Sequence, residues 1–157
     1  MTATIERARD ALADHLEDGE RVLAAVQAQL EGGTMRLASR VGLAVGTGAM
    51  GAAAVAMIPG DAAEVDARLA NGLVLAVTDR RLVLLDVSAV SARPKEPVVG
   101  IDRALVTDVA TGEKRVMLVK LPTIELTLDG EPDRVLRLEV PKVGRREAEA
   151  VVQALRS

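Results

Sequence analysis

Seven short aliphatic runs, six of them separated only by turns and loops, constrain the fold of this chain more than any other feature. Runs of this length that are bounded by Gly, Pro, Asn and Asp are typical of β-strands. Strands that follow one another without intervening helices predict an antiparallel sheet or barrel, not a parallel α/β sheet. We expect strands at 22–30, 73–77, 82–87, 98–109, 116–121, 124–128 and 135–140.

Turn-forming residues set the predicted boundaries between these strands. Residues 78–81 contain Asp79 and predict a hairpin turn, and Thr111-Gly112-Glu113-Lys114 predicts another. Pro122 cannot donate a ladder hydrogen bond, so we expect it to separate the fifth and sixth strands. Residues 129–133 predict the last turn.

Amphipathic helices are expected at both ends of the chain. Residues 5–16 have apolar side chains at helical spacing, and Gly19 is placed to end that helix. From residue 143 onward the same spacing predicts a C-terminal helix. A short helix is expected at 61–70, before Asn71-Gly72. The predicted fold is mainly β with α: a seven-stranded antiparallel barrel or sandwich with a helix at each end.

The composition excludes several functional classes. Phe, Trp, Tyr and Cys are absent and His15 is the only histidine, so disulfides, thiolate catalysis, Cys/His zinc sites and base-stacking platforms are excluded. A net charge of -3 argues against nucleic acid as a partner. No carboxylates stand in a recognisable catalytic spacing. We therefore expect neither an enzyme nor a bound cofactor or metal, and the core must consist of aliphatic side chains.

Residues 41–60 contain no charged residue. The spacing of their glycines indicates an alternative function. Gly46, Gly48 and Gly51 match the G-x-G-x-x-G pattern, in which glycines let the backbone approach a pyrophosphate. The acidic residue that should follow about 20 residues later is missing. A dinucleotide-binding protein therefore stays the alternative hypothesis rather than the preferred one.

The same uncharged segment can also be considered as a membrane or packing element. Twenty helical residues reach about 30 Å, nominally a membrane span, but strongly apolar residues are few among them. Small residues at four-residue spacing, such as Gly42 and Gly46, instead allow close helix packing, either in the fold or against a second copy. An exposed apolar segment of this length would leave a patch that monomers rarely tolerate. Burial or self-association is the favoured interpretation.

Two short motifs carry a resemblance to a known family. Asp18-Gly19-Glu20-Arg21-Val22-Leu23 leads into the first strand, and Leu75-Ala76-Val77-Thr78-Asp79-Arg80-Arg81-Leu82 spans the next hairpin. With the order of one strand, a long connection, six strands and a closing helix, the chain resembles bacterial pleckstrin-homology-like (PH-like or GRAM-like) domains. The resemblance implies a PH-like domain over 20–157, after an N-terminal helix over 1–19, with a Gly/Ala-rich insertion at 34–70.

This resemblance also implies a non-catalytic interaction or scaffold module. Such domains tend towards homo-oligomers, so we expect a second copy or another protein as the partner. The loop after the first strand is the headgroup side in lipid-binding members, which adds an anionic membrane surface as a partner and a lipid-regulated module as an alternative. Because Glu6 and Asp10 exclude a signal peptide, we expect a cytoplasmic protein at the inner face of the membrane.

The candidate site residues fall into two groups, and His15 is expected to be a plain surface residue. The membrane or oligomer contacts are Arg36, Arg40, Val41, Leu43, Val45, Met50, Val55, Met57 and Ile58. The candidate anion contacts are Arg80, Arg81, Lys142, Arg145 and Arg146.

Overall fold

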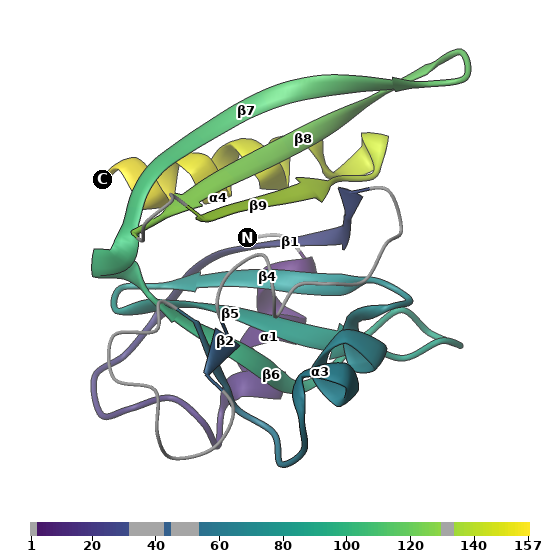
Figure 1. The fold of residues 1–157 in the computed structure, drawn as a ribbon. Coiled ribbons are helices and arrows are strands. Elements are labelled where there is room, and N and C mark those ends of the chain that lie inside the picture. The colour runs from purple at the N-terminus through teal and green to yellow at the C-terminus, as the bar shows by residue number, and fades with distance from the viewer. Residues whose placement is uncertain (1–2, 32–42, 45–53, 130–133) are drawn as a thin grey trace.

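The computed structural model describes residues 3–31, 43–44, 54–129 and 134–157 (Figure 1). Helices lie at both ends of the chain, and strands make up most of what lies between them. The elements are α1 (Ala3–Leu12), β1 (Val22–Leu30), β2 (Leu43–Ala44), β3 (Ala54–Ala56), α3 (Ala62–Leu69), β4 (Leu73–Thr78), β5 (Arg81–Val87), β6 (Pro94–Asp102), η2 (Arg103–Leu105), β7 (Val106–Val116), β8 (Val119–Leu128), β9 (Arg134–Glu139), η3 (Lys142–Gly144) and α4 (Arg145–Arg156).

The described strands form one curled sheet in the order β2-β3-β6-β5-β4-β1-β9-β8-β7. All neighbours are antiparallel except β2 and β3, which are parallel. β1 joins two halves of the sheet, because it pairs with β4 from Val22 to Ala28 and then with β9 at Gln29 and Leu30. Figure 1 shows the half containing β4, β5 and β6 below β1, and the half containing β7, β8 and β9 above it.

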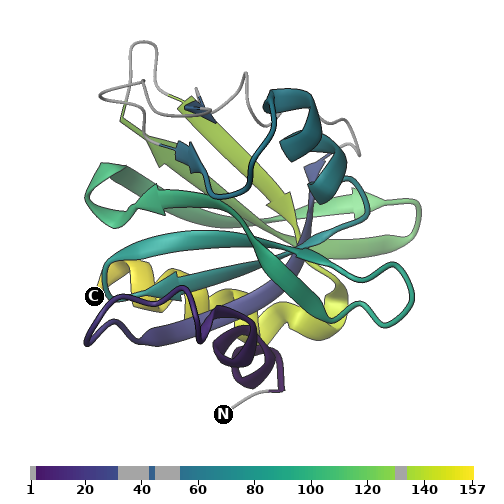
Figure 2. The ribbon, with the colours of Figure 1, turned by 90° about the horizontal axis from the view of Figure 1, so that it is seen from below.

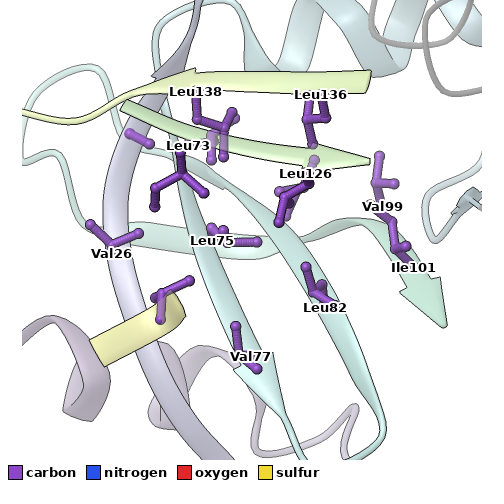
Figure 3. Close-up of a cluster of buried hydrophobic side chains, with 14 of the residues drawn as sticks. Val26, Leu73, Leu75, Val77, Leu82, Val99, Ile101, Leu126, Leu136 and Leu138 are labelled. Atoms are coloured by element: carbon purple, nitrogen blue, oxygen red, sulfur yellow. The ribbon is translucent and has the colours of Figure 1, made fainter. Parts of the chain in front are cut away.

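Aliphatic side chains fill the space between the two halves, as the absence of aromatic residues requires. Figure 3 shows Leu75 and Leu82 from the lower half in the same cluster as Leu126 and Leu136 from the upper half. Val151 of α4 belongs to this inner cluster and is completely buried. α4 therefore covers the core from one side (Figure 2).

β4 and β5 in the lower half of the sheet are buried on both faces, which explains their continuous apolar runs. Successive residues of a strand point to opposite faces. In β4, Leu73 and Leu75 join the inner cluster, whereas Val74 and Ala76 join a second cluster under α1. Every residue of β4 is buried. The run 73–77 therefore lacks the polar alternation of a half-exposed strand.

The expected order of elements is confirmed: one strand, a long connection, six further strands and a closing helix. The expected number of seven strands is wrong, because the described residues of the connection add β2 and β3. The single strand expected at 98–109 is divided by η2 into β6 and β7. The N-terminal helix ends at Leu12 rather than 16, and Gly19 lies beyond it with a φ of 78°.

The turn expected at residues 111–114 is also wrong. These residues belong to β7 and pair with residues 121–124 of β8. The two strands expected at 116–121 and 124–128 are one strand, and the chain reverses at Met117 and Leu118. Pro122 is accommodated because β8 pairs with β9 only from Thr123 onward. The carbonyl of Pro122 still accepts the amide of Val140 at 2.8 Å.

Candidate interaction surfaces

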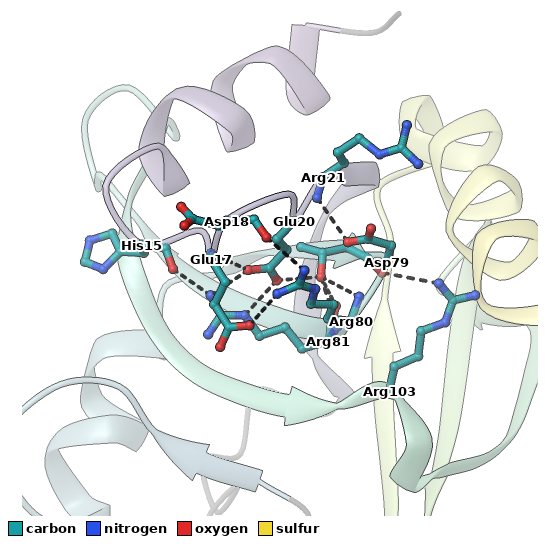
Figure 4. A network of polar contacts seen from close by, with 10 residues as sticks. His15, Glu17, Asp18, Glu20, Arg21, Asp79, Arg80, Arg81 and Arg103 are labelled. Carbon is teal, nitrogen blue, oxygen red and sulfur yellow. Dashed lines mark hydrogen bonds and ion pairs between the residues drawn. The ribbon is translucent and has the colours of Figure 1, made fainter.

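The β4–β5 turn places Arg81 against a buried carboxylate. The Nε atom of Arg81 lies 2.9 Å from Oε1 of Glu20, and a terminal nitrogen lies 3.2 Å from Oε2 (Figure 4). The Glu20 side chain is completely covered, whereas 22% of the Arg81 side chain is exposed. Arg81 also donates to the carbonyl of His15 at 2.7 Å. This arginine therefore joins the segment before β1 to the start of β5.

Glu20 has two further hydrogen-bond donors. Thr78 donates from Oγ1 at 2.7 Å, and the backbone amide of Glu17 donates at 2.9 Å. Burial raises the pKa of Glu20, but the hydrogen bonds from Arg81, the Glu17 amide and Thr78 outweigh it and hold the pKa below its ordinary value of 4.5. Glu20 thus remains a charged partner that occupies Arg81.

Arg80, the other predicted anion contact of this turn, also binds groups of the chain itself. Its guanidinium lies 2.7 Å from a carboxylate oxygen of Glu17 and 2.8 Å from the carbonyl oxygen of Asp18. About half of the side chain remains exposed. The two turn arginines therefore neutralise carboxylates of their own chain.

A hollow of about 330 Å³ brings together predicted residues from both groups. Its lining includes Val55 and Met57 from the predicted membrane or oligomer contacts, and Arg80 and Arg81 from the predicted anion contacts. Glu17 and Asp102 line it as well, so its charges are balanced. Ile58, by contrast, is 8% exposed and packs in the inner core.

Of the other predicted contacts of the 36–58 segment, one lies within the described residues. Leu43 contributes its backbone to β2, which pairs with β3. Outside the described residues lie Arg36, Arg40, Val41, Val45, Met50, Gly46, Gly48 and Gly51.

The β7–β8 hairpin carries the largest cluster of exposed apolar side chains among the described residues. Met117 is 89% exposed and Leu118 is 95% exposed, and the flanking Val116 and Val119 are 41% and 46% exposed. Figure 1 shows the hairpin projecting beyond the rest of the sheet. We call residues 116–119 the hairpin tip.

The backbone conformation at Met117 is unfavourable for a methionine. Val116 pairs with Val119, so Met117 and Leu118 form a two-residue connection. Met117 has a φ of 57°. Positive φ at the first residue of such a connection favours glycine, and a bulky side chain there is a conformational outlier. An outlier of this kind motivates a functional hypothesis for the side chain.

Basic residues flank the hairpin tip on both strands. Lys114 and Arg115 precede it on β7, and Lys120 follows it on β8. Lys114 contacts Glu139 at 2.8 Å and Glu31 at 3.5 Å. No ion pair of Arg115 or Lys120 is present within the described part of the chain.

Sequence reasoning missed the hairpin tip, although a signal was present. The tip contains neither Gly, Pro, Asn nor Asp, so its residues resembled the interior of a strand. The signal was the symmetry of the segment: Lys114-Arg115, four apolar residues, and then Lys120.

The remaining predicted anion contacts lie where β9 leads into α4. Lys142 is exposed in η3, and Arg145 pairs with Glu113 of β7 at 3.0 Å. Arg146 is exposed on the first turn of α4. Val143 lies among these cations and is 95% exposed. We call residues 142–146 the η3–α4 corner.

The described residues contain neither a membrane-spanning helix nor a metal-binding cluster of side chains. None of the helices there is both long enough and apolar enough to cross a membrane. No group of three or more His, Asp or Glu side chains in that part of the chain is arranged to hold a metal ion.

Comparisons with known proteins give a likeness to solved structures alone. No protein-family model matches the chain, and no curated protein matches it. Among solved structures, the chain is similar to the crystal structure of a pleckstrin homology domain from Shewanella amazonensis SB2B, with 13% sequence identity and a TM-score of 0.45. The match covers 94% of this chain and 96% of that chain. At this identity, function has to be argued from the side chains of this chain itself.

Proposed function

We propose that the chain is a non-catalytic interaction module that docks on an anionic lipid bilayer through its hairpin tip. The exposure of Met117 and Leu118 carries this proposal. Burying a Leu or Met side chain contributes about 1.5–3 kcal/mol, and each cation near an anionic membrane contributes about 1 kcal/mol. Contributions of this size support reversible, peripheral binding rather than permanent insertion.

The shape of the hairpin tip favours a bilayer over a folded protein. The tip is a narrow projection with two nearly fully exposed apolar side chains, so a protein partner would need a matching pocket. A bilayer offers an apolar interior without such a pocket. Arg115 and Lys120 stand on the two strands beside the tip, where they can reach anionic headgroups.

This proposal assigns the membrane contact to a different part of the chain from the predicted 36–58 segment. Val55 lines a hollow with Arg80 of the β4–β5 turn. In Figure 1 that turn lies at the left-hand end, and the hairpin tip lies at the right-hand end. One flat bilayer surface does not reach both ends equally, so variants can separate the two contacts.

Vesicle flotation tests the proposal. Wild-type protein should float with phosphatidylglycerol vesicles at low salt and less well with phosphatidylcholine vesicles. The double variant Met117→Ser/Leu118→Ser should lose most of this binding. Val55→Thr is the matched control, because it removes exposed apolar surface from the predicted segment while keeping a β-branched residue in β3. Far-UV circular dichroism checks that each variant is folded.

Four results would contradict the proposal. Wild-type protein could remain unbound to both kinds of vesicle, or the tip variant could float as wild type does. Loss of binding in Val55→Thr alone would support the predicted 36–58 contact instead. A concentration-dependent dimer in sedimentation without lipid, removed by the tip variant, would assign the tip to self-association.

A further inference from the structure

We infer that the hairpin tip is one of three contacts on a single bilayer-facing end of the molecule. This inference rests on the proposed membrane function and extends it to the η3–α4 corner and to the β5–β6 loop, residues 88–93. Each of the three segments exposes at least one apolar side chain almost completely: Val90 is 98% exposed and Val143 is 95% exposed, beside Met117 and Leu118.

The three segments lie at the same end of the fold. In Figure 1 and Figure 2, the hairpin tip, the β5–β6 loop and the start of α4 all lie to the right, and the C-terminus lies to the left. The two views are related by rotation about the horizontal axis, so left and right are preserved between them. Three separated contacts define a plane, which is what a rigid domain needs to rest on a flat surface.

Two contacts fix the η3–α4 corner to the base of the hairpin. Arg145 pairs with Glu113 of β7 at 3.0 Å, and the amide of Val140 donates to the carbonyl of Pro122 in β8 at 2.8 Å. The tip begins at Val116, three residues beyond Glu113, and Met117 is the next residue. A strand rises about 3.3 Å per residue. The tip therefore extends about 10–13 Å beyond this joint, which exceeds the roughly 5–8 Å thickness of one headgroup layer.

Exposed cations accompany all three contacts. Lys142 and Arg146 belong to the η3–α4 corner, and Arg93 and Lys95 border the β5–β6 loop. None of these four side chains forms an ion pair within the described residues. Of the nearby carboxylates, Glu113 and Glu96 are already paired with Arg145 and Arg68, and Glu147 follows Arg146 in the first turn of α4. The cations of this end still outnumber its unpaired carboxylates. Charge complementarity therefore selects an anionic bilayer as the single partner of this end.

In this arrangement the hairpin tip provides insertion into the bilayer, and the cations of the other two segments provide selectivity for anionic lipids. The tip reaches the apolar interior, whereas the cations of the other two segments remain at the headgroup level. Salt should therefore weaken the contribution of the η3–α4 corner more than that of the tip.

Site-specific labelling tests the inference, and the absence of cysteine makes it direct. Single-cysteine variants Val90→Cys, Met117→Cys and Val143→Cys are labelled with an environment-sensitive fluorophore. Val55→Cys is the matched control, because Val55 is an exposed apolar residue that lines the hollow beside Arg80, near the opposite end of the molecule. On addition of phosphatidylglycerol vesicles, we expect emission to increase at positions 90, 117 and 143 but not at 55. Quenchers placed along the acyl chains should act most strongly on position 117.

The outcomes separate this inference from the proposed function. A response at position 117 alone would overturn the three-contact surface and leave the tip as the docking element. No response at 117 would overturn the proposed function itself. A response at 55 comparable to that at 117 would overturn the orientation inferred here.

A charge variant gives an independent measurement. Lys142→Gln/Arg146→Gln should weaken partitioning on phosphatidylglycerol vesicles at low salt by about 10- to 30-fold. Arg7→Gln/Arg21→Gln makes the same charge change on exposed residues of α1 and at the opposite end of β1, and should have little effect. Equal losses in the two variants would mean that only net charge matters, and this would overturn the role of the η3–α4 corner.

Discussion

Arg81 and Glu20 form an ion pair in which the carboxylate is fully buried and the guanidinium is partly exposed, with 2.9 Å between Nε and Oε1. The neighbouring Arg80 pairs with Glu17 at 2.7 Å, but both of those side chains are largely exposed. Adjacent residues of one turn thus carry the same functional group in two environments. The burial of the partner carboxylate, not the distance, should decide how much each pair contributes to stability.

We expect Arg81→Met to lower the free energy of unfolding by about 3–5 kcal/mol, because it leaves a buried carboxylate without its cation. Arg80→Met removes an exposed, solvent-screened pair and should lower stability far less than Arg81→Met does. Urea denaturation followed by far-UV circular dichroism measures both, since the chain has no tryptophan. Similar losses in the two variants would show that the pair with Glu20 contributes no more than a surface pair.

The pair should also make stability depend on acid pH. The folded pKa of Glu20 is below its ordinary value of 4.5, so its contribution is complete above that pH and is lost as the pH falls through the folded pKa. Glu20→Gln cannot ionise. We therefore expect wild type to be more stable than Glu20→Gln at neutral pH, and the difference to shrink steadily below pH 4.5. Urea midpoints measured across this range check this, and parallel curves for the two proteins would contradict it.

β4 and β5 of the lower half could be predicted closely from the sequence, and the projecting hairpin could not. β4 and β5 are buried on both faces, so each appears in the sequence as an uninterrupted apolar run that predicts a buried strand. Residues 111–114 have the composition of a turn, but pairing with β8 overrides that local preference. The true turn contains Met117 and Leu118, which are strand-like residues. Local sequence signals therefore failed at the hairpin tip, where the chain exposes apolar side chains that proteins ordinarily bury.

Part of the candidate site could likewise be predicted from the sequence, and part of it could not. Arg80 and Arg81 were correctly placed at a hairpin turn, but their acidic partners Glu17 and Glu20 are about 60 residues away in the chain. No sequence spacing could reveal that these cations are already neutralised. Val55 and Met57 likewise meet Arg80 only because β3 pairs with β6.

Arg103 is a structural residue that the sequence did not single out. It donates to the carbonyl of Thr78 at 3.3 Å and, at the end of α4, to the carbonyls of Ala154 and Ser157. These bonds tie the corner between β6 and β7 to the C-terminal end of the helix, where a cation is favourable.

We expect Arg103→Lys to lower the free energy of unfolding by about 1–2 kcal/mol, because an ammonium group cannot make the same set of directed bonds. Arg115→Lys makes the same change at an exposed residue and should alter stability by less than about 0.5 kcal/mol. Urea denaturation of both variants measures the difference. If Arg103→Lys is as stable as wild type, the three carbonyl contacts are dispensable.

The hairpin tip offers a prediction in which stability and binding change in opposite directions. Met117 has a φ of 57°, a conformation that glycine adopts without strain. We therefore expect Met117→Gly to raise the free energy of unfolding by about 1 kcal/mol. The same change removes an 89% exposed apolar side chain, so partitioning on phosphatidylglycerol vesicles should fall.

Ala92→Gly is the matched control for this variant. Ala92 has a φ of 55°, so the substitution should relieve similar backbone strain while it removes only a methyl group. We expect both variants to be more stable than wild type in urea. Met117→Gly should lose much more vesicle binding than Ala92→Gly, because Ala92→Gly removes only a methyl group from the β5–β6 loop. Opposite signs for stability and binding at one residue would show that the chain keeps methionine there for the contact that it makes. If Met117→Gly binds vesicles as wild type does, Met117 has no part in docking and the hairpin tip loses its main anchor.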